Sequence, residues 1–530
     1  MSRRTVLVAG LALGATVTLA ATSQAVGAGQ GPSTFGAEPG GFAAYHGTHL
    51  TAQPKDLPQN KRAAYSGQPL VLAQSYVGRK AAEPTLGVTK NGDIYTVAAA
   101  FDAIPGNPPK NEPRTLVEKS TDGGRTWKEA QPNVAGQNTM VVSTDPYIFV
   151  DPNVSKGNGR IFDIDLQGVN GAHLSYSDDD GKTWTDTVLT SAGVNDHQTL
   201  VSGVEPEGVT IPLLDPAYQK VLYYCVNSIG YGACTRSFDG GRTFVQGDQT
   251  GYEAFNPDYL ASFDSDHNEG ICGSLHGHAV TDRFGRLFVP RGYCQIPMIG
   301  ISSDAANTFH DVTVSDKIGM SGQQASVAVD KKDNLYYVWQ DNKFNLPYLS
   351  ISRDHGEHWS APLMIAPPGV KATDFPTIDV GDPGRIAITF PGTTTEGTKD
   401  KARPWNSYVV MSTDALSANP LFLSNTANPK WDPVHRGDCN GRCGRMYDFL
   451  DVVSSPGDQG RVFATAVDTC TKLNDCSTKR VPGENDDDIV TYEAGDPHGA
   501  AQDMQGVVIR EVSGPALRGT SPWIGKDSGR

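Results

Sequence analysis

The stretch Ser120-Thr-Asp122-Gly-Gly124-Arg-Thr-Trp127 decides the fold, because the chain repeats it. Close copies stand at residues 177–184, 237–244 and 352–359, with a worn copy at 302–309 and a stub at 412–414. Their serines follow one another at intervals of 57, 60, 65, 50 and 60 residues, which suits a four-stranded blade with its loops. A repeat of this period predicts a β-propeller.

The repeated turn has a mechanical meaning. Its aspartate accepts hydrogen bonds from the turn backbone, its glycine takes a positive φ, and its aromatic ring packs under the hairpin. Because these polar groups are used by their own turn, we assign no chemistry to Asp122, Asp179, Asp239 or Asp354. The 58 glycines and 35 prolines, with few long helical patterns, agree with an all-β fold.

The repeated turn resembles the Asp box of the sialidase-like propellers, and the resemblance covers most of residues 75–512. An inner hairpin precedes each turn in this pattern. Seven such hairpins stand in the sequence, and they begin near Glu83, Asp145, His197, His276, Gln324, Asp374 and Tyr447. We therefore predict seven blades, with six as the second choice, because only six hairpins retain any part of the Asp box.

The two ends of the chain are expected to lie outside the propeller. Arg3 and Arg4, an uncharged apolar run, and the small residues Ser23 and Ala25 form the pattern of a signal peptide over residues 1–25. We expect a secreted protein and favour the ordinary secretory route over twin-arginine export. Residues 26–74 are expected to form an N-terminal arm and residues 513–530 a flexible tail. No later segment is apolar enough to span a membrane.

The eight cysteines fall into four close pairs, which we expect to be disulfides in an exported chain. The pairs are Cys225–Cys234, Cys272–Cys294, Cys439–Cys443 and Cys470–Cys476. The alternative is a zinc site built from the last four thiols, although none of them forms a tight C-x-x-C pair.

The charge balance excludes one class of partner. The chain has 44 basic and 59 acidic residues, for a formal charge of −15. An acidic chain without a basic patch argues against nucleic acid as a partner.

Polar residues open the predicted inner strands. Since inner strands of a propeller run along its central axis, their first residues should surround one mouth of the channel. These residues are Glu83, Asp145, His197, His276 or His278, Gln324, Asp374 and Asp448. Converging polar side chains at a concave mouth predict a binding site, although the mouth of a propeller is wet and polar in any case.

The family resemblance implies roles for some of these residues. Tyr447-Asp-Phe-Leu450 resembles the strand that carries the tyrosine nucleophile of sialidases, which implies Tyr447 as nucleophile with Glu83 or Asp448 as its base. The position of Asp102, after the first hairpin, implies the acid/base residue. The first strand departs from the family, because Ala82-Glu83-Pro84 stands where sialidases carry Arg-Ile-Pro.

Several arginines are candidates for holding an acidic sugar. Guanidinium groups bind carboxylates in a bidentate manner, so converging arginines would mark such a site. The candidates are Arg291, Arg403, Arg436 and Arg445. The alternative for each is an ordinary surface ion pair.

No cofactor is required by this chemistry, and calcium is the one candidate ion. Asp264, Asp266 and Asn268 place oxygen ligands at alternate positions, as calcium loops do. His276 and His278 could hold a transition metal, but we favour hydrogen bonding or acid–base work for them.

Three functions remain open. The first is a glycoside hydrolase that acts on terminal, acidic sugars of glycans. The second is a polysaccharide lyase on the same scaffold, with histidine and tyrosine moving a proton beside an arginine-bound uronate. The third is a non-catalytic propeller that binds carbohydrate or protein. In each case we expect a monomer with no membrane span.

The disulfide assignment predicts the result of peptide mapping. Non-reduced digests of the exported protein should contain Cys225 linked to Cys234 and Cys272 linked to Cys294, as found by mass spectrometry. Free thiols at these four positions would contradict the assignment.

Overall fold

The computed structural model describes a β-rich chain. It describes residues 45–46, 49–50, 61–78, 81–100, 114–130, 145–154, 157–166, 171–189, 195–211, 214–228, 231–250, 275–293, 295–321, 324–396, 403–429, 432–436, 449–469 and 505–525. The only helical element in these ranges is the short 3-10 turn η2 (Asp458–Gly460). None of the helices among the described residues has the length and apolarity needed to cross a bilayer.

Four consecutive sheets have four strands each, paired in chain order. The first contains β6 (Ala81–Val88), β7 (Ile94–Ala100), β8 (Arg114–Ser120) and β9 (Lys128–Glu129). The second contains β10 (Tyr147–Asp151), β11 (Arg160–Leu166), β12 (Ala172–Ser177) and β13 (Thr185–Leu189). The third contains β14 (Asp196–Gly203), β15 (Val221–Ser228), β16 (Tyr231–Ser237) and β17 (Val245–Thr250). The fourth contains β18 (Val280–Thr281), β19 (Leu287–Tyr293), β20 (Ile296–Ser302) and β21 (His310–Thr313).

Three further sheets combine consecutive strands with additions from elsewhere. The fifth contains β22 (Ser326–Val329), β23 (Leu335–Gln340), β24 (Pro347–Ser352), β25 (Leu363–Met364) and β3 (Lys61–Arg62). The sixth contains β26 (Ala372–Thr373), β27 (Thr377–Val380), β28 (Ile386–Thr393), β29 (Pro404–Ser412), β30 (Leu421–Thr426), β31 (His435–Arg436) and β4 (Ala64–Tyr65). The seventh contains β32 (Val452–Ser454), β33 (Val462–Asp468), β34 (Gln505–Pro515), β35 (Trp523–Ile524) and β5 (Val71–Tyr76). A separate pair joins β1 (Tyr45–His46) to β2 (His49–Leu50).

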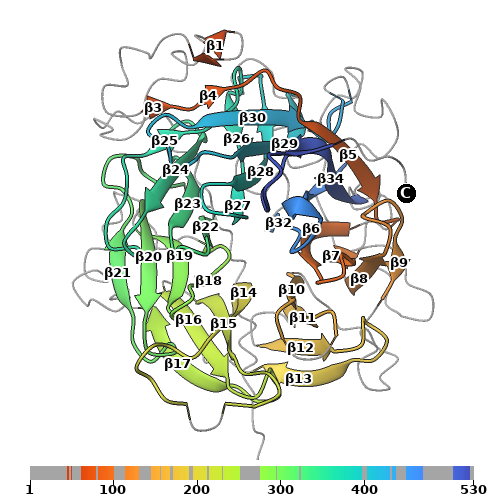
Figure 1. Ribbon diagram of the computed structural model, residues 1–530, viewed down its shortest axis with the longest axis vertical. Coiled ribbons are helices and arrows are strands. Elements are labelled where there is room, and N and C mark those ends of the chain that lie inside the picture. Colours follow the sequence, from red (N-terminus) through yellow and green to blue (C-terminus); the bar gives the residue numbers. More distant parts are fainter. Residues whose placement is uncertain are drawn as a thin grey trace, which may run out of the picture. The chain divides into compact units, whose positions relative to one another are not determined.

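The seven sheets follow one another round a ring with their first strands innermost, which is the architecture of a β-propeller (Figure 1). The all-β propeller prediction is therefore confirmed, and the seven inner hairpins of the sequence fall in seven separate sheets. Apolar residues fill the spaces between neighbouring sheets. Phe162 and Leu222, for example, belong to one buried cluster between the second and third sheets.

The ring is closed by strands from the two ends of the described chain. The seventh sheet takes its inner strands from the C-terminal part, and its outer strand β5 from the N-terminal part, paired antiparallel with β34. The preceding strands β3 and β4 add parallel edges to β25 and β30. Strands from residues 61–74, expected in an N-terminal arm, therefore belong to three of the sheets.

Residues 513–525 differ from the flexible tail that we expected. Strand β35 pairs with the end of β34, and Leu517 and Ile524 are buried. The Arg518 guanidinium donates to Ser454 Oγ at 2.9 Å and to the Ser455 carbonyl at 3.1 Å. A few apolar residues and one arginine are enough to hold this polar, glycine-rich segment, which composition alone does not reveal.

The repeated turns contain the predicted hydrogen bonds. In the first turn, Asp122 Oδ1 accepts from the backbone N–H groups of Arg125 and Thr126, at 2.9 and 3.0 Å. The Thr126 hydroxyl donates to Asp122 Oδ2 at 2.6 Å, and the glycine N–H of Gly124 donates to Ser120 Oγ at 2.9 Å. Gly124 has φ of +79°. Although burial acts to raise it, these hydrogen bonds hold the pKa of the Asp122 carboxyl below its usual range.

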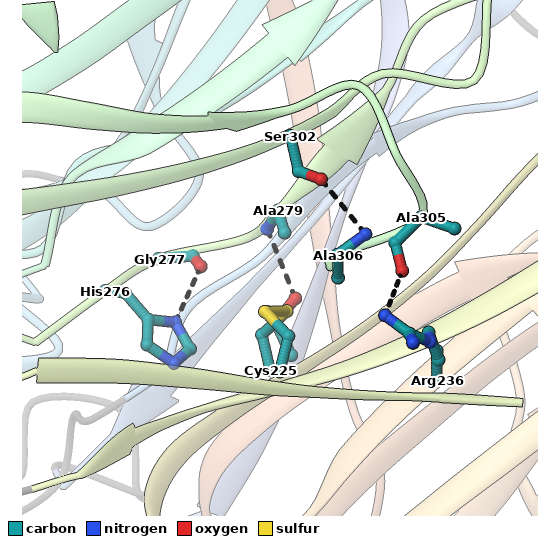
Figure 2. The surroundings of a disulfide bond; sticks show 10 residues. Cys225, Arg236, His276, Gly277, Ala279, Ser302, Ala305 and Ala306 are labelled. Carbon is teal, nitrogen blue, oxygen red and sulfur yellow. Dashed lines mark hydrogen bonds between the residues drawn. A yellow bond between two sulfur atoms is a disulfide. The ribbon is translucent and has the colours of Figure 1, made fainter. Parts of the chain in front are cut away.

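The Cys225–Cys234 disulfide is present and joins β15 to β16 at directly paired positions. Both cysteines are buried among apolar residues of the third and fourth sheets. Figure 2 shows this bond near Ala279 of the following sheet. The other six cysteines lie outside the described residues.

An acidic pair is buried where the first two sheets meet. Asp163 and Asp165 lie on the same side of β11, and the Thr115 hydroxyl of β8 donates to Asp165. Within the described part of the chain, neither carboxyl oxygen of Asp163 has a hydrogen-bond partner. Burial, with the nearby Asp186 charge, raises the pKa of Asp165 to about 8, and burial beside Asp165 raises that of Asp163.

We predict that Asp122→Ala destabilises the protein without altering the ring centre. The variant loses four hydrogen bonds within one surface turn, so the free energy of unfolding should fall by about 1–3 kcal/mol. Urea denaturation measures this change. A variant as stable as the wild type would contradict the structural role of the turn.

We predict that Asp163→Asn alters how stability depends on pH. A carboxyl whose folded pKa is raised holds its proton longer when folded than when unfolded, so its contribution to stability is lost as pH rises toward the folded pKa. The wild type should therefore lose stability from pH 5 to pH 8. The asparagine side chain stays neutral. The free energy of unfolding of the variant should therefore exceed that of the wild type by about 1 kcal/mol or more at pH 8, and by less at pH 5.

The exposed Asp316 provides the control for this measurement, because Asp316→Asn removes a charge without changing a buried pair. The urea denaturation midpoints of the wild type, Asp163→Asn and Asp316→Asn at pH 5, 6.5 and 8 test the prediction. Parallel pH curves for the wild type and Asp163→Asn would show that Asp163 is ionised in the folded protein.

Candidate functional site

Hydrogen bonds between neighbouring inner strands define a common level in the ring, which we call the linking layer. The backbone N–H of Ile148 donates to Thr85 Oγ1, that of Ala279 to Thr199 Oγ1, that of Ile378 to Ser326 Oγ, and that of Leu86 to Asp451 Oδ2. Each acceptor occupies the same position in its inner strand. Each N–H donor belongs to the residue directly after that position in the neighbouring inner strand. The linking layer therefore contains Thr85, Tyr147, Thr199, His278, Ser326, Thr377 and Asp451.

Two residues earlier in each inner strand lies a second level, which we call the polar ring. Its members are Glu83, Asp145, His197, His276, Gln324, Phe375 and Phe449. All seven are at most 7% exposed. Five of them are polar, and each of these five was predicted as a site residue. These predicted residues thus stand two positions before the linking layer in five different inner strands, and His197 of the third sheet contacts His276 of the fourth.

The backbone is strained where the polar ring begins. Glu83, His197 and Phe375 have φ of 54°, 48° and 41°, although none is glycine. The register of the inner strand shifts at Glu83 and again at His197, as a β-bulge does. Bulges redirect side chains, and strained residues of this kind gather at functional sites.

Phe449 joins the polar ring to aromatic side chains of other sheets. It comes from the seventh sheet and stacks on His197 of the third, with ring centroids 4.2 Å apart and an interplanar angle of 19°. Tyr147 of the second sheet meets Phe449 edge to face at 6.0 Å, and His276 meets His197 at the same distance. Aromatic contacts therefore join the polar ring across the second, third, fourth and seventh sheets. Asp448 was the residue predicted in this strand, whereas its neighbour Phe449 was not predicted.

In the linking layer, His278 of the fourth sheet reaches across the ring to Asp451 of the seventh. Its Nδ1 lies 3.4 Å from Asp451 Oδ1, and Tyr147 meets the His278 ring edge to face at 5.4 Å. Burial lowers the pKa of His278 to about 4 and raises that of the Asp451 carboxyl well above its usual range. Asp451 was not predicted, although it stands where neighbouring strands carry threonine or serine.

Arg291 and His276 lie near each other in the fourth sheet. Arg291 is 1% exposed and belongs to β19. Burial, and then the Arg291 charge, lowers the pKa of His276 to about 4, although a hydrogen bond between its Nδ1 and the Gly277 carbonyl acts the other way (Figure 2). His276 is therefore a neutral imidazole at pH 7 with a cation nearby.

The remaining described candidates belong to the fifth and sixth sheets. Gln324 Nε2 donates to Thr377 Oγ1 at 3.1 Å, and the Phe375 N–H donates to Asp374 Oδ1 at 3.2 Å. Arg403 is buried with its guanidinium 4.8 Å from the centre of the Trp405 ring. Arg436 lies in β31, which pairs with β29 directly after Arg403.

Several predicted residues lie outside the described residues, and their roles stay predictions. They are Asp102, Asp264, Asp266, Asn268, Arg445, Tyr447, Asp448, Cys272, Cys294, Cys439, Cys443, Cys470 and Cys476. Among the residues that the structure describes, no group of three histidine, cysteine or acidic side chains is arranged to hold a metal ion.

A groove of about 790 Å³ lies away from this level, between the outer strands of the fifth and sixth sheets. Trp359, Arg353 and Pro420 are among the residues that line it. It contains none of the predicted site residues. We place the candidate site at the polar ring, because buried polar groups and backbone strain coincide there.

Comparison with known proteins gives weak but consistent likenesses. No family model matches the chain. Over 196 residues it is 29% identical to a sialidase from Micromonospora viridifaciens, in an alignment that covers 32% of this chain and 29% of that protein. The chain thus matches less than a third of the length of this relative.

Solved structures with a similar arrangement of sheets have low sequence identity. An α-L-arabinofuranosidase, Arb93A from Fusarium graminearum, is 13% identical and aligns 64% of this chain with 96% of its own, at a TM-score of 0.38. The K499G mutant of the NanB sialidase from Streptococcus pneumoniae is 10% identical and aligns 84% with 71%, at 0.39. The Aleuria aurantia lectin is 10% identical and aligns 63% with 93%, at 0.37. Likenesses at this level do not select an activity.

Proposed function

We propose that this protein is a glycoside hydrolase that acts on terminal, acidic sugars of glycans. The observation that carries the proposal is the polar ring, in which Glu83, Asp145, His197, His276 and Gln324 are buried near the start of five inner strands. Polar groups are costly to bury, so a protein that buries them at the start of several inner strands gains from what they bind. The sequence similarity to a sialidase supports a sugar as that ligand.

The roles of the residues follow from their chemistry. Tyr447 is the proposed nucleophile, with Glu83 or Asp448 as the base that accepts its phenolic proton. A phenol has an ordinary pKa near 10 and needs such a base at neutral pH. Asp102 would protonate the leaving oxygen and then activate water.

The substrate class follows from the arginines. A sugar carboxylate would be held by Arg291 with Arg403, Arg436 and Arg445, because guanidinium groups match carboxylates in shape and charge. The absence of the Arg-Ile-Pro segment favours an acidic sugar other than sialic acid. The other polar-ring side chains, together with His278 and Asp374, would bind sugar hydroxyls.

A polysaccharide lyase is the second candidate function, and one observation favours it. Burial keeps His276 and His278 neutral at pH 7, so either can accept a proton, and Arg291 lies near His276. In an elimination, a base removes the proton at C5 of a uronate, the C4–O bond breaks, and the departing oxygen takes a proton.

The proposal includes export to the extracellular space. The buried Cys225–Cys234 disulfide suits an oxidising compartment, as does the signal-peptide pattern at residues 1–25.

We predict that Tyr447→Phe removes turnover and leaves the fold intact. The experiment first screens the wild type against sialosides, uronic acid glycans and arabinans. On the substrate that is cleaved, the variant should lose activity by at least about 100-fold, because only the phenolic oxygen is removed. Unchanged thermal unfolding shows that the fold survives.

Asp122→Ala is the matched control, because it weakens a surface turn and should keep turnover. Full activity of Tyr447→Phe would show that the nucleophile is wrong. Products with the ultraviolet absorbance of an unsaturated uronate would identify elimination and replace the hydrolase with the lyase, since only elimination makes that group. No cleavage of any glycan in the screen would defeat both enzymatic proposals.

A further inference from the structure

Asp451 has one oxygen more than its structural task requires. In the linking layer, Thr85, Thr199 and Ser326 each accept the N–H of the next sheet with a single hydroxyl. Asp451 performs the same task with Oδ2, which accepts from the Leu86 N–H at 3.1 Å. A threonine or serine would therefore suffice for the ring. The second oxygen of Asp451 is left for another purpose.

That second oxygen faces a histidine. Asp451 Oδ1 accepts from its neighbour Val452 at 2.8 Å and lies 3.4 Å from His278 Nδ1. The His278 side chain is 13% exposed, whereas that of Asp451 is 5% exposed. The other ring nitrogen, His278 Nε2, is buried and has no hydrogen-bond partner among the described residues. A buried nitrogen left in this state is a place for a ligand atom or a water molecule.

The hydrogen bonds around Asp451 suit its ionised form. Two backbone N–H groups already donate to the two oxygens, and an N–H from His278 would be a third donor. Such donors lower the pKa of a carboxyl, in opposition to the burial and the Asp379 charge that raise it. Among the described residues, His276 and the edge of Tyr147 also lie near His278, and neither is a cation at pH 7.

We propose that Asp451 positions His278 as a base of the candidate site. The carboxylate holds the imidazole proton on Nδ1, which leaves the lone pair of Nε2 directed away from Asp451 and available to an incoming hydroxyl. His278 thereby replaces Glu83 or Asp448 as the base: when an oxygen nucleophile attacks the anomeric carbon, its proton passes to Nε2, directly or through one water. The glycosidic C–O bond breaks, and an acid of the site protonates the leaving oxygen. The resulting imidazolium is stabilised by the Asp451 charge.

This inference rests on the proposed function for its catalytic part, but not for the arrangement of the proton. An aspartate that orients a histidine and fixes its tautomer is a recurrent way to make a base at neutral pH. Asp451 itself is a positioning residue, because it acts only through His278.

The tautomer is measured first, on the full-length protein with ¹⁵N-labelled histidine. The His278 signal is identified as the one that His278→Gln removes. At pH 7 the wild type should carry its proton on Nδ1, and Asp451→Asn should move it to Nε2, since the amide donates where the carboxylate accepts. A wild-type His278 with its proton on Nε2 would mean that Asp451 is the donor, and would overturn the inference whatever the activity.

Turnover is measured next, on the glycan found in the screen. His278→Gln and Asp451→Asn should each lower kcat by about 100-fold or more, with KM within a few-fold. Ser326→Ala is the matched control, because it breaks a linking-layer bond at the same level and should keep both the tautomer and kcat. If His278→Gln turns over as the wild type does, the catalytic role is wrong. If no glycan is cleaved, the proposed function and the catalytic role of His278 both fail. The measured tautomer still shows whether Asp451 holds the proton on His278 Nδ1.

Discussion

The pairing of β5 with β34 is the interaction on which the rest of the structure depends. A ring of sheets has no end sheet only if the last sheet closes on the first. Here the seventh sheet lacks an outer strand until residues 71–76 supply it. The hydrogen bonds of the linking layer then run between neighbouring sheets, among them those from Leu86 to Asp451 and from Thr465 to Pro84, which join the seventh sheet to the first. Closure thus places inner strands from distant parts of the chain at one level.

A closed ring explains why so many polar groups can be buried at its centre. Each inner strand faces the others across a narrow axis, so a side chain from one sheet reaches another without crossing a core. Phe449 covers His197 from the opposite side of the ring, and His278 meets Asp451 in the same way. The apolar clusters between the sheets stabilise the fold by burying hydrophobic side chains. Polar side chains, which are costly to bury in such clusters, lie along the axis instead.

The repeated turns made the fold predictable, because their residues interact locally and their spacing reports the blade. The polar start of each inner strand was predictable for the same reason, since Glu83, His197 and Gln324 stand at equivalent places in equivalent strands. What depends on partners across the ring was not predictable. Asp451 differs from serine or threonine only by comparison with other strands, and nothing local indicates that Phe449 stacks on His197. The Cys225–Cys234 pair was found because its partners are near in sequence. The ordered segment 513–525 was missed because the partners of Arg518, Ser454 and Ser455, lie far from it in the sequence.

Because β5 and β34 come from opposite ends of the described chain, they also set the order in which parts of the protein can fold. More than four hundred residues separate the two strands, so their pairing is among the least local contacts of the chain. Sheets one to four are each built from consecutive strands and can form as the chain lengthens. Ring closure has to wait until residue 513 is available. Until then the edges of β33 and β5 that pair with β34 have no partner, and a chain shortened before β34 never passes beyond that stage.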